Sequence, residues 1–212
     1  SRLGANSWWA TALITPDVSA GYLTLAMWSM GTDSKLQIHA RAPTRIDLAG
    51  GTLDLWPLYL LTPTHGACVS TLNLGIDLFA EAGLSWEPNA TDEVELRAED
   101  QGTSLKFPWG ALDLCDFTPP PNVELHYKLL RELVNRPQLV GGLHSLFQKK
   151  GKLTLSTRAK SPAGAGLGGS STLSIAILGA LGAWVRGGKV IQVGEEELGV
   201  RLVELVRDIE TT

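Results

Sequence analysis

The stretch SPAGAGLGGSST, residues 161–172, separates two segments of different polarity. Before it, Leu153 and Leu155 alternate with hydroxyl residues, a pattern typical of a half-buried strand. After it, residues from about 171 to 185 are largely apolar and predict a long buried helix. Glycines let a backbone approach a ligand closely, and the first turn of a helix carries a partial positive charge. The stretch therefore predicts a phosphate-binding loop, and the alternative is a flexible surface loop whose serines cap the helix.

Two common phosphate loops match this stretch poorly. A Walker A loop requires a lysine after its last glycine, but Gly169 is followed by Ser170, so a P-loop NTPase is disfavoured. Gly164, Gly166 and Gly169 fit the GxGxxG pattern of dinucleotide-binding folds. In those folds the preceding strand is continuously apolar and an acidic residue follows about 20 positions later, and the sequence has neither feature. A nicotinamide-dependent oxidoreductase is therefore the less favoured alternative.

The rest of the chain reads as strands followed by helices. Short runs with strand character are expected over residues 35–42, 44–49, 68–74, 76–82, 94–98 and 104–107. Pro43 separates the first two runs, Gly75 is expected to turn the second two into a pair, and the last two predict a hairpin. Asn122 is expected to cap a helix that ends before Pro137. This order predicts an α+β fold rather than a doubly wound sheet.

The composition is that of a globular protein, with 44% hydrophobic and 19% charged residues among 212. The net charge of −4 disfavours general nucleic-acid binding and attachment to anionic membranes. No apolar run reaches the roughly 18 residues that a transmembrane helix needs. Cys68 and Cys115 lie far apart and form no CxxC pair, which indicates a reducing compartment, so a cytoplasmic location is expected. The four histidines show no metal-ligand spacing, and nothing in the sequence indicates an oligomeric state.

Both ends of the chain depart from the pattern of a complete domain. Residues 1–29 show no regular period, and the sequence from Met30 reads as a better start, so the folded domain is expected over residues 30–212. Residues 195–212 predict an amphipathic helix that reaches the last residue without a glycine or proline stop. Its apolar face is expected to consist of Leu198, Leu202, Leu205 and Ile209. The chain is therefore expected to be a fragment.

Two ordered motifs resemble those of the GHMP kinases, the superfamily of galactokinase, homoserine kinase, mevalonate kinase and phosphomevalonate kinase. PAGAGLGGSS, residues 162–171, resembles the central signature PxxxGLGSSA. RAPTRIDLAGGTLD, residues 41–54, resembles the amino-terminal motif RAPxRIxxAGGGTD of the sugar-kinase branch, which includes heptose 7-phosphate kinase and fucokinase. The resemblance extends over roughly residues 35 to 212 and corresponds to the amino-terminal part of these kinases.

The resemblance implies a fold, a reaction and a set of site residues. The fold is the ribosomal protein S5 domain 2-like α+β domain, a mixed or antiparallel sheet packed with helices. The reaction is the Mg²⁺-dependent transfer of the γ-phosphate of ATP to a hydroxyl of a sugar or sugar phosphate, of heptose or hexose type. The implied ATP-binding residues are Pro162, Gly164, Gly166, Leu167, Gly168, Gly169, Ser170 and Ser171, with Ser170 also a ligand of Mg²⁺. The implied catalytic residue is Arg45, and the implied substrate-binding residues are Asp47, Gly51, Thr52 and Asp54.

The sequence departs from the family pattern at three places. Gly169 stands where many members have the first serine of a pair, and the run from Gly51 to Asp54 differs from GGTD by one position. The family's third glycine-rich motif and its main catalytic aspartate are expected beyond residue 212. Asp208 is expected to be a solvated helix residue instead. By itself the fragment is therefore expected to be inactive, and a non-catalytic nucleotide-binding module is the other alternative.

Overall fold

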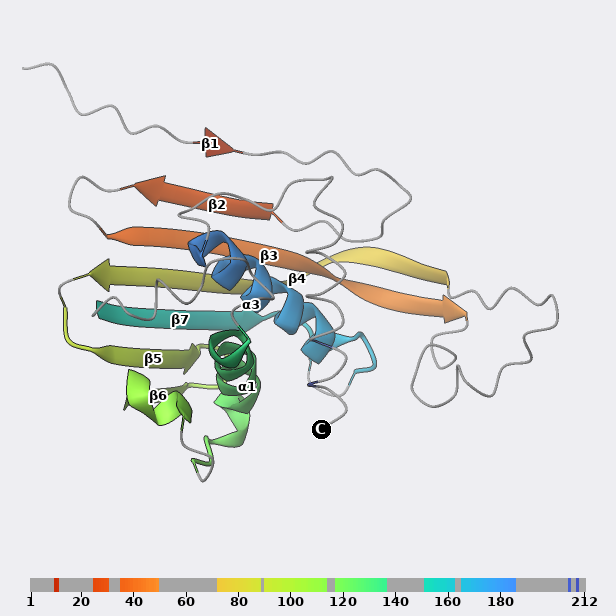
Figure 1. The fold of residues 1–212 in the computed structure, drawn as a ribbon. Coiled ribbons are helices and arrows are strands. Elements are labelled where there is room, and N and C mark those ends of the chain that lie inside the picture. The colour runs from red at the N-terminus through yellow and green to blue at the C-terminus, as the bar shows by residue number, and fades with distance from the viewer. Residues whose placement is uncertain are drawn as a thin grey trace, which may run out of the picture.

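The computed structural model describes residues 35–49, 72–88, 90–113, 117–136, 151–162 and 165–185, together with Val206, Ile209 and the backbone of residues 10–11 and 25–30. Its strands form one twisted sheet in the order β1-β2-β3-β4-β7-β5-β6 (Figure 1). The strands are β1 (Ala10–Thr11), β2 (Leu25–Met30), β3 (Leu36–Ala49), β4 (Leu72–Pro88), β5 (Glu93–Ala98), β6 (Thr103–Pro108) and β7 (Gly151–Ala159). Neighbouring strands are antiparallel except for β5 and β7, which are parallel.

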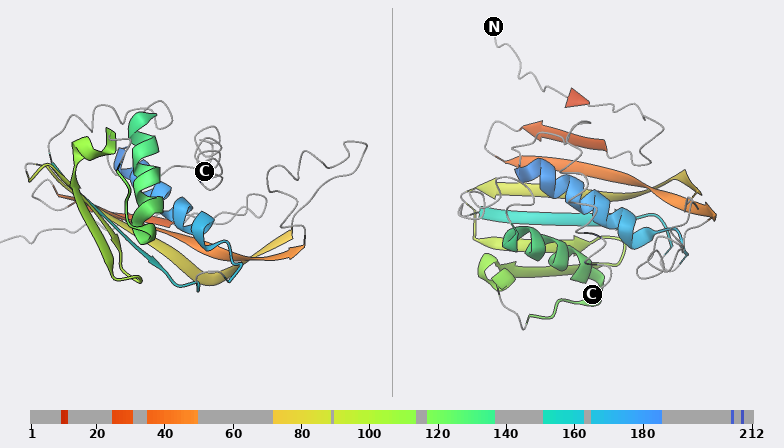
Figure 2. Two further views of the ribbon diagram at one scale, coloured as in Figure 1. Left: turned by 90° about the horizontal axis from the view of Figure 1, so that it is seen from below. Right: turned by 45° about the vertical axis from the view of Figure 1, so that its right-hand side comes forward.

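Helices α1 (Pro121–Asn135) and α3 (Gly169–Val185) pack against the same face of this sheet, and the short 3₁₀ helix η2 (Trp109–Asp113) follows β6. Figure 2 shows both helices on one side, with the strands as a second layer beneath them. The predicted α+β class, a mixed sheet packed with helices, is confirmed. The strand before the glycine-rich stretch, β7, is parallel to β5 but antiparallel to β4, so it does not belong to an all-parallel sheet, which argues against the dinucleotide-binding alternative.

The alternation of side chains along the strands explains why the helices choose this face. On β3 and β4 the residues that face the helices are mostly small, and they include the buried Ala40, Ala42, Ala80 and Ala82. These alanines let α3 approach the sheet closely, so that its apolar side chains fill the interior. At the far end of α3, the Trp184 ring lies 5.3 Å from Trp86. This aromatic contact fixes the position of α3 on the sheet.

The opposite face of the sheet is polar and carries ion pairs between neighbouring strands. The carboxylate of Glu95 lies between Arg97 at 2.7 Å, Lys152 at 3.4 Å and Lys106 at 3.7 Å. Burial raises the pKa of Glu95, but the hydrogen bonds and charges of Arg97, Lys152 and Lys106 outweigh it, so the pKa lies below its ordinary value. Because it carries these charged side chains, this face of the sheet suits contact with water or polar ligands and does not suit a second apolar layer.

Local predictions agree with the structure in some segments and are wrong in others. The hairpin of β5 and β6 and the half-buried strand β7 are confirmed. The break at Pro43 is wrong, because β3 continues through it. The hairpin about Gly75 is also wrong within the part described, because β4 passes straight through Gly75 and pairs with β3. The pairing of β3 with β4 shifts register between Pro43 and Arg45 of β3. At this shift, the Thr44 hydroxyl donates a hydrogen bond to the Leu78 carbonyl at 2.7 Å.

The helix predicted after the prolines starts two residues earlier than expected, since its N-cap is Pro120 rather than Asn122. Pro121 occupies the first helical position, where its missing N–H costs nothing, so Asn122 is not the cap. Instead, the amide of Asn122 donates to the Thr103 hydroxyl at 3.0 Å. The helix ends at Asn135, before Pro137 as predicted.

The two ends of the chain are described only in part. The boundary predicted between residues 29 and 30 falls within β2, which pairs with β3 from Leu25 to Met30. Of the predicted last helix, Val206 and Ile209 are described, and both are helical and buried in the core. The predicted face residues Leu198, Leu202 and Leu205 lie outside the described residues, as does Asp208.

Candidate functional site

The glycine-rich stretch forms the connection between β7 and α3. The Lys160 N–H donates to the Phe79 carbonyl at 3.2 Å, which fastens the start of the connection to β4. Two of its glycines, Gly166 and Gly168, have φ values of +70° and +63°, a region that residues with side chains rarely adopt. This backbone conformation explains the glycine requirement at both positions and turns the chain into the first turn of α3.

The first turn of α3 is closed by one residue. Thr172 donates to the Gly168 carbonyl through both its N–H, at 2.9 Å, and its hydroxyl, at 2.8 Å. Ser170 is exposed in this turn, and Ser171 is half-buried. The first turn carries no acidic side chain, so no fixed negative charge opposes an anion at the positive end of the helix.

The register of the sheet brings the amino-terminal motif to this loop. Pro43 of β3 pairs with Phe79 of β4, and the neighbouring Ala80 pairs with Ala159 at the end of β7. Residues just after Pro43 therefore lie level with the beginning of the glycine-rich stretch, on the other side of β4. The two motifs that are far apart in the sequence thus meet at one edge of the helix layer.

Arg45 is the residue that makes this contact. A Cβ atom placed on Gly168 would lie 3.6 Å from the Nε of Arg45, so the arginine side chain borders the space above this glycine of the loop. The Arg45 side chain is 30% exposed, and its Nε lies 3.4 Å from a carboxylate oxygen of Asp47. The buried Nε makes no hydrogen bond within the part of the chain that the structure describes. Arg45 therefore lies beside the loop, and Asp47 forms an ion pair with it.

A serine that the sequence analysis did not select also borders the loop. A Cβ atom on Gly169 would lie 3.3 Å from the hydroxyl oxygen of Ser161. Because Gly169 has no side chain, the Ser161 hydroxyl can lie close to its backbone. Gly169 is also the position at which the sequence departs from the family pattern. The sequence showed Ser161 at the start of the stretch, but the contact depends on the turn that folds the stretch back on itself.

Several predicted residues cannot be placed. Gly51, Thr52, Asp54 and Gly164 lie outside the described residues. Pro162 is exposed and Leu167 half-buried in the loop. Among the described residues there is no group of three or more metal-ligating side chains, and no described helix is long and apolar enough to span a membrane.

A buried histidine lies beneath the strand that leads to the loop. His126 of α1 contacts the hydroxyl of Thr157 on β7 through Nε2 at 2.5 Å, and it is 1% exposed. Burial lowers the pKa of His126, and the negative charge of Asp100 raises it by a smaller amount, so that the pKa is about 4. The imidazole is therefore neutral at neutral pH and contributes to the core rather than to the loop.

Comparisons with known proteins agree with this geometry. The family model described as the GHMP kinases N terminal domain matches residues 129–211, a range that includes β7, the loop and α3. A search among curated proteins finds no match.

Two solved structures illustrate the likeness in fold. A D-glycero-D-manno-heptose 1-phosphate kinase from Bacteriodes thetaiotaomicron is 24% identical, with a TM-score of 0.57 over 81% of this chain and 49% of its own. The mevalonate kinase of Methanococcus jannaschii is 14% identical, with a TM-score of 0.57 over 86% of this chain and 49% of its own. The chain thus spans about half the length of these structures, and the resemblance to the amino-terminal part of GHMP kinases is confirmed.

Proposed function

We propose that this chain supplies the ATP-binding part of a small-molecule kinase that transfers the γ-phosphate of ATP to a hydroxyl of a sugar or sugar phosphate. The observation that carries the proposal is the contact of Arg45 with Gly168 at the mouth of the glycine-rich loop. A cation beside a glycine turn and a helix N-terminus is an arrangement suited to phosphate groups. The family match and the kinase fold support the same assignment.

The loop fits the phosphates of a nucleotide in three respects. Among the described residues, no atom lies within 4 Å of a Cβ placed on Gly166, so these residues leave room for a ligand to approach the backbone. The left-handed turns at Gly166 and Gly168 direct the chain into the first turn of α3, whose N–H groups have no helical partner. The exposed hydroxyl of Ser170 lies in the same turn and is a suitable oxygen ligand for Mg²⁺.

The residues of the chain would act mainly by positioning and by neutralising charge. Phosphoryl transfer requires little covalent participation of the protein, so that orientation and electrostatic stabilisation dominate the rate. Arg45 lies where its guanidinium can face the transferred phosphate, and the half-exposed side chain leaves room for that contact. When bound, Mg²⁺ would neutralise part of the phosphate charge, and Ser170 is the residue that would hold it.

Asp47 is proposed to orient Arg45, because the two side chains form an ion pair. Its carboxylate lies 3.4 Å from the Nε of Arg45, so it orients the guanidinium toward Gly168. We assign Asp47, Gly51, Thr52 and Asp54 to the sugar side of the site on the strength of the amino-terminal motif. No general base is assigned among the described residues, and the main catalytic carboxylate is proposed to lie outside these 212 residues.

The sugar acceptor is supported by sequence and by a neighbour. The motif at residues 41–54 is closest to the sugar-kinase branch, and one solved neighbour is a heptose phosphate kinase. The sugar substrate and its phosphorylation are therefore proposed for the whole protein. We also propose a cytoplasmic location, because two cysteines far apart in the sequence suit a reducing compartment.

The test is ADP formation by the whole protein with Mg²⁺-ATP and a panel of free and phosphorylated hexoses and heptoses. The proposal expects ADP release that depends on one or a few of these sugars and that falls sharply in an Arg45→Ala variant. The matched control is Arg136→Ala, which removes an arginine paired with Glu132 at the end of α1. Sugar-independent ADP release, or nucleotide binding with no turnover on any acceptor, would favour a nucleotide-binding module instead.

A further inference from the structure

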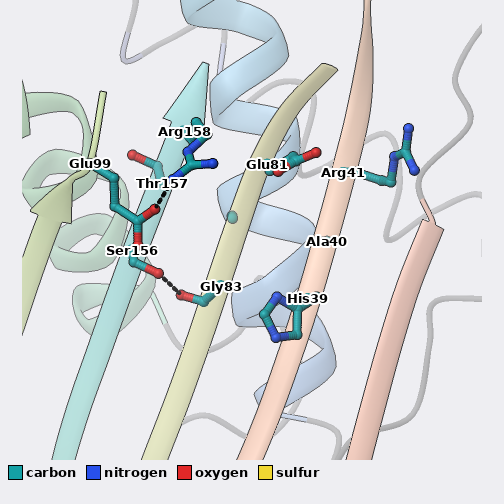
Figure 3. Close-up of a pocket in the computed structure, with 10 residues that line it drawn as sticks. His39, Ala40, Arg41, Glu81, Gly83, Glu99, Ser156, Thr157 and Arg158 are labelled. Atoms are coloured by element: carbon teal, nitrogen blue, oxygen red, sulfur yellow. Dashed lines mark hydrogen bonds and ion pairs between the residues drawn. The ribbon is translucent and has the colours of Figure 1, made fainter. Parts of the chain in front are cut away.

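A hollow of about 310 Å³ lies on the polar face of the sheet, on the side opposite to α3 (Figure 3). None of the loop residues that the structure describes, 161–162 and 165–169, lines it. The polar side chains around it come from β3, β4, β7 and the turn after β5: His39, Arg41, Glu81, Glu99, Ser156 and Arg158. Its walls come from four separate segments of the chain, so no local sequence pattern predicts it.

Gly83 forms the floor of the hollow. A Cβ atom placed on it would lie 2.9 Å from the Ser156 hydroxyl and 3.6 Å from the His39 ring. The side chains of β3 and β7 therefore stand on either side of a gap that only glycine leaves open. Figure 3 shows the Ser156 hydroxyl turned toward the Gly83 carbonyl, to which it donates at 3.4 Å.

Some of the charged side chains around the hollow form ion pairs with other described residues, and Arg41 does not. Arg158 pairs with Glu99 at 3.2 Å, and Lys160 pairs with Glu81 at 3.8 Å. Arg41 makes no ion pair or hydrogen bond to any other described residue. Its guanidinium carbon lies 3.6 Å from the centre of the Phe79 ring instead. The ring orients the guanidinium without neutralising it. Because the Nε is buried, the two terminal nitrogens of the guanidinium are the ones that would face an anion.

These features define one class of ligand. We propose that the hollow binds a small polyol that carries one phosphate or carboxylate group. The anionic group would pair with Arg41 and accept a hydrogen bond from His39, because a guanidinium binds such groups through two parallel hydrogen bonds. The hydroxyls would contact Ser156 and the carboxylates of Glu81 and Glu99, which accept hydrogen bonds and disfavour a ligand with several negative charges. The inference does not depend on the proposed kinase function.

The experiment is a titration of the ¹⁵N-labelled 212-residue chain with ribose 5-phosphate, gluconate and unmodified ribose, observed by amide chemical shifts. We expect both anionic probes to shift the amides of His39, Gly83 and Ser156. Ribose should bind at least about tenfold more weakly, because it lacks the charged group. A Gly166→Val variant, altered in the loop, should leave these shifts in place, which separates the hollow from the proposed ATP site.

Two variants test the hollow directly. Gly83→Ala should abolish the shifts by filling the floor, whereas Gly110→Ala, whose added Cβ meets no atom within 4 Å, should preserve them. Arg41→Gln should weaken binding of both anionic probes about tenfold or more, and Arg136→Gln should not. Should Gly83→Ala fail to fold, Arg41→Gln decides alone. Shifts confined to residues 165–170, equal binding of ribose, or binding unaffected by Arg41→Gln would overturn the proposal.

Discussion

The Nε of Arg45 lies 3.6 Å from the position that a Cβ atom on Gly168 would occupy. One residue belongs to β3 and the other to the turn before α3, and the pairing of both β3 and β7 with β4 brings them together. A cation is thus held against a glycine turn that opens a helix, beside its partner Asp47. This arrangement brings a residue of each sequence motif to the same end of α3.

Shortening Arg45 should affect turnover more than folding. Arg45→Ala removes the charge beside the loop, and the loss of one such stabilising group typically costs about 10²-fold in turnover. Arg45→Lys retains the charge but not the planar, paired geometry, so it should recover only part of the rate. The measurement is kcat of the whole protein with its sugar acceptor, with thermal unfolding recorded for each variant. Equal rates for Arg45→Ala and wild type would show that the arginine is a surface strand residue.

Ser170 should matter chiefly when the metal is present. Ser170→Ala removes an exposed hydroxyl in the first turn of α3, while the N–H groups of that turn remain. We therefore expect the affinity for Mg²⁺-ATP to fall, and the affinity for ATP in EDTA to change little. Isothermal titration with and without Mg²⁺ measures both. An equal loss under the two conditions would assign the hydroxyl to the phosphates or to the helix cap instead.

Gly169 and Ser161 should be coupled in stability. Gly169→Ser places a Cβ atom 3.3 Å from the Ser161 hydroxyl, so the neighbouring side chain must move by a few tenths of an ångström. The single variant should lower the melting temperature, and the double variant with Ser161→Gly should recover most of the loss. Additive effects in this double-mutant cycle would show that the two residues do not interact.

His126 predicts a specific dependence of stability on pH. Its pKa is about 4 in the folded protein and 6.5 ordinarily, so below pH 6.5 the unfolded chain binds a proton that the folded chain does not. The free energy of unfolding should therefore fall as the pH drops from 6.5 toward 4, by an amount on the order of 3 kcal/mol at most.

The measurement for His126 is urea unfolding at pH 7.5 and at pH 5, compared with His126→Gln. The glutamine variant cannot gain a proton, so its loss between the two pH values should be smaller than that of wild type. Carboxylates that titrate in the same range affect both proteins equally, and the difference isolates the histidine. Identical losses in the two proteins would mean that the ring is already protonated, or hydrated, in the folded state.

The sequence predicted the features that depend on neighbouring residues. The alternation in β7, the hairpin of β5 and β6 and the apolar run of α3 are local patterns, and all three occur in the structure. Pro43 and Gly75 misled the prediction because a strand tolerates both when its partner shifts register, as β4 does opposite Thr44.

In the candidate site too, the features within one segment could be predicted, and the contacts between segments could not. The glycine-rich loop could be located from the sequence because its glycines and hydroxyls are contiguous. The contact of Arg45 with the loop follows from the register of three strands, and the contact of Ser161 with Gly169 follows from the fold of the turn. Neither register nor turn geometry can be obtained from spacing alone.

The most direct test of the account is the affinity of the chain for Mg²⁺-ATP in two matched glycine variants. Gly166 and Gly102 both have left-handed φ values, +70° and +60°, and a Cβ atom on either meets no atom within 4 Å. Valine at either position should therefore cost similar backbone strain. We predict that Gly166→Val abolishes binding in isothermal titration while Gly102→Val, in the turn between β5 and β6, retains wild-type affinity. Unchanged affinity in a folded Gly166→Val protein would contradict the assignment of the loop to the phosphates.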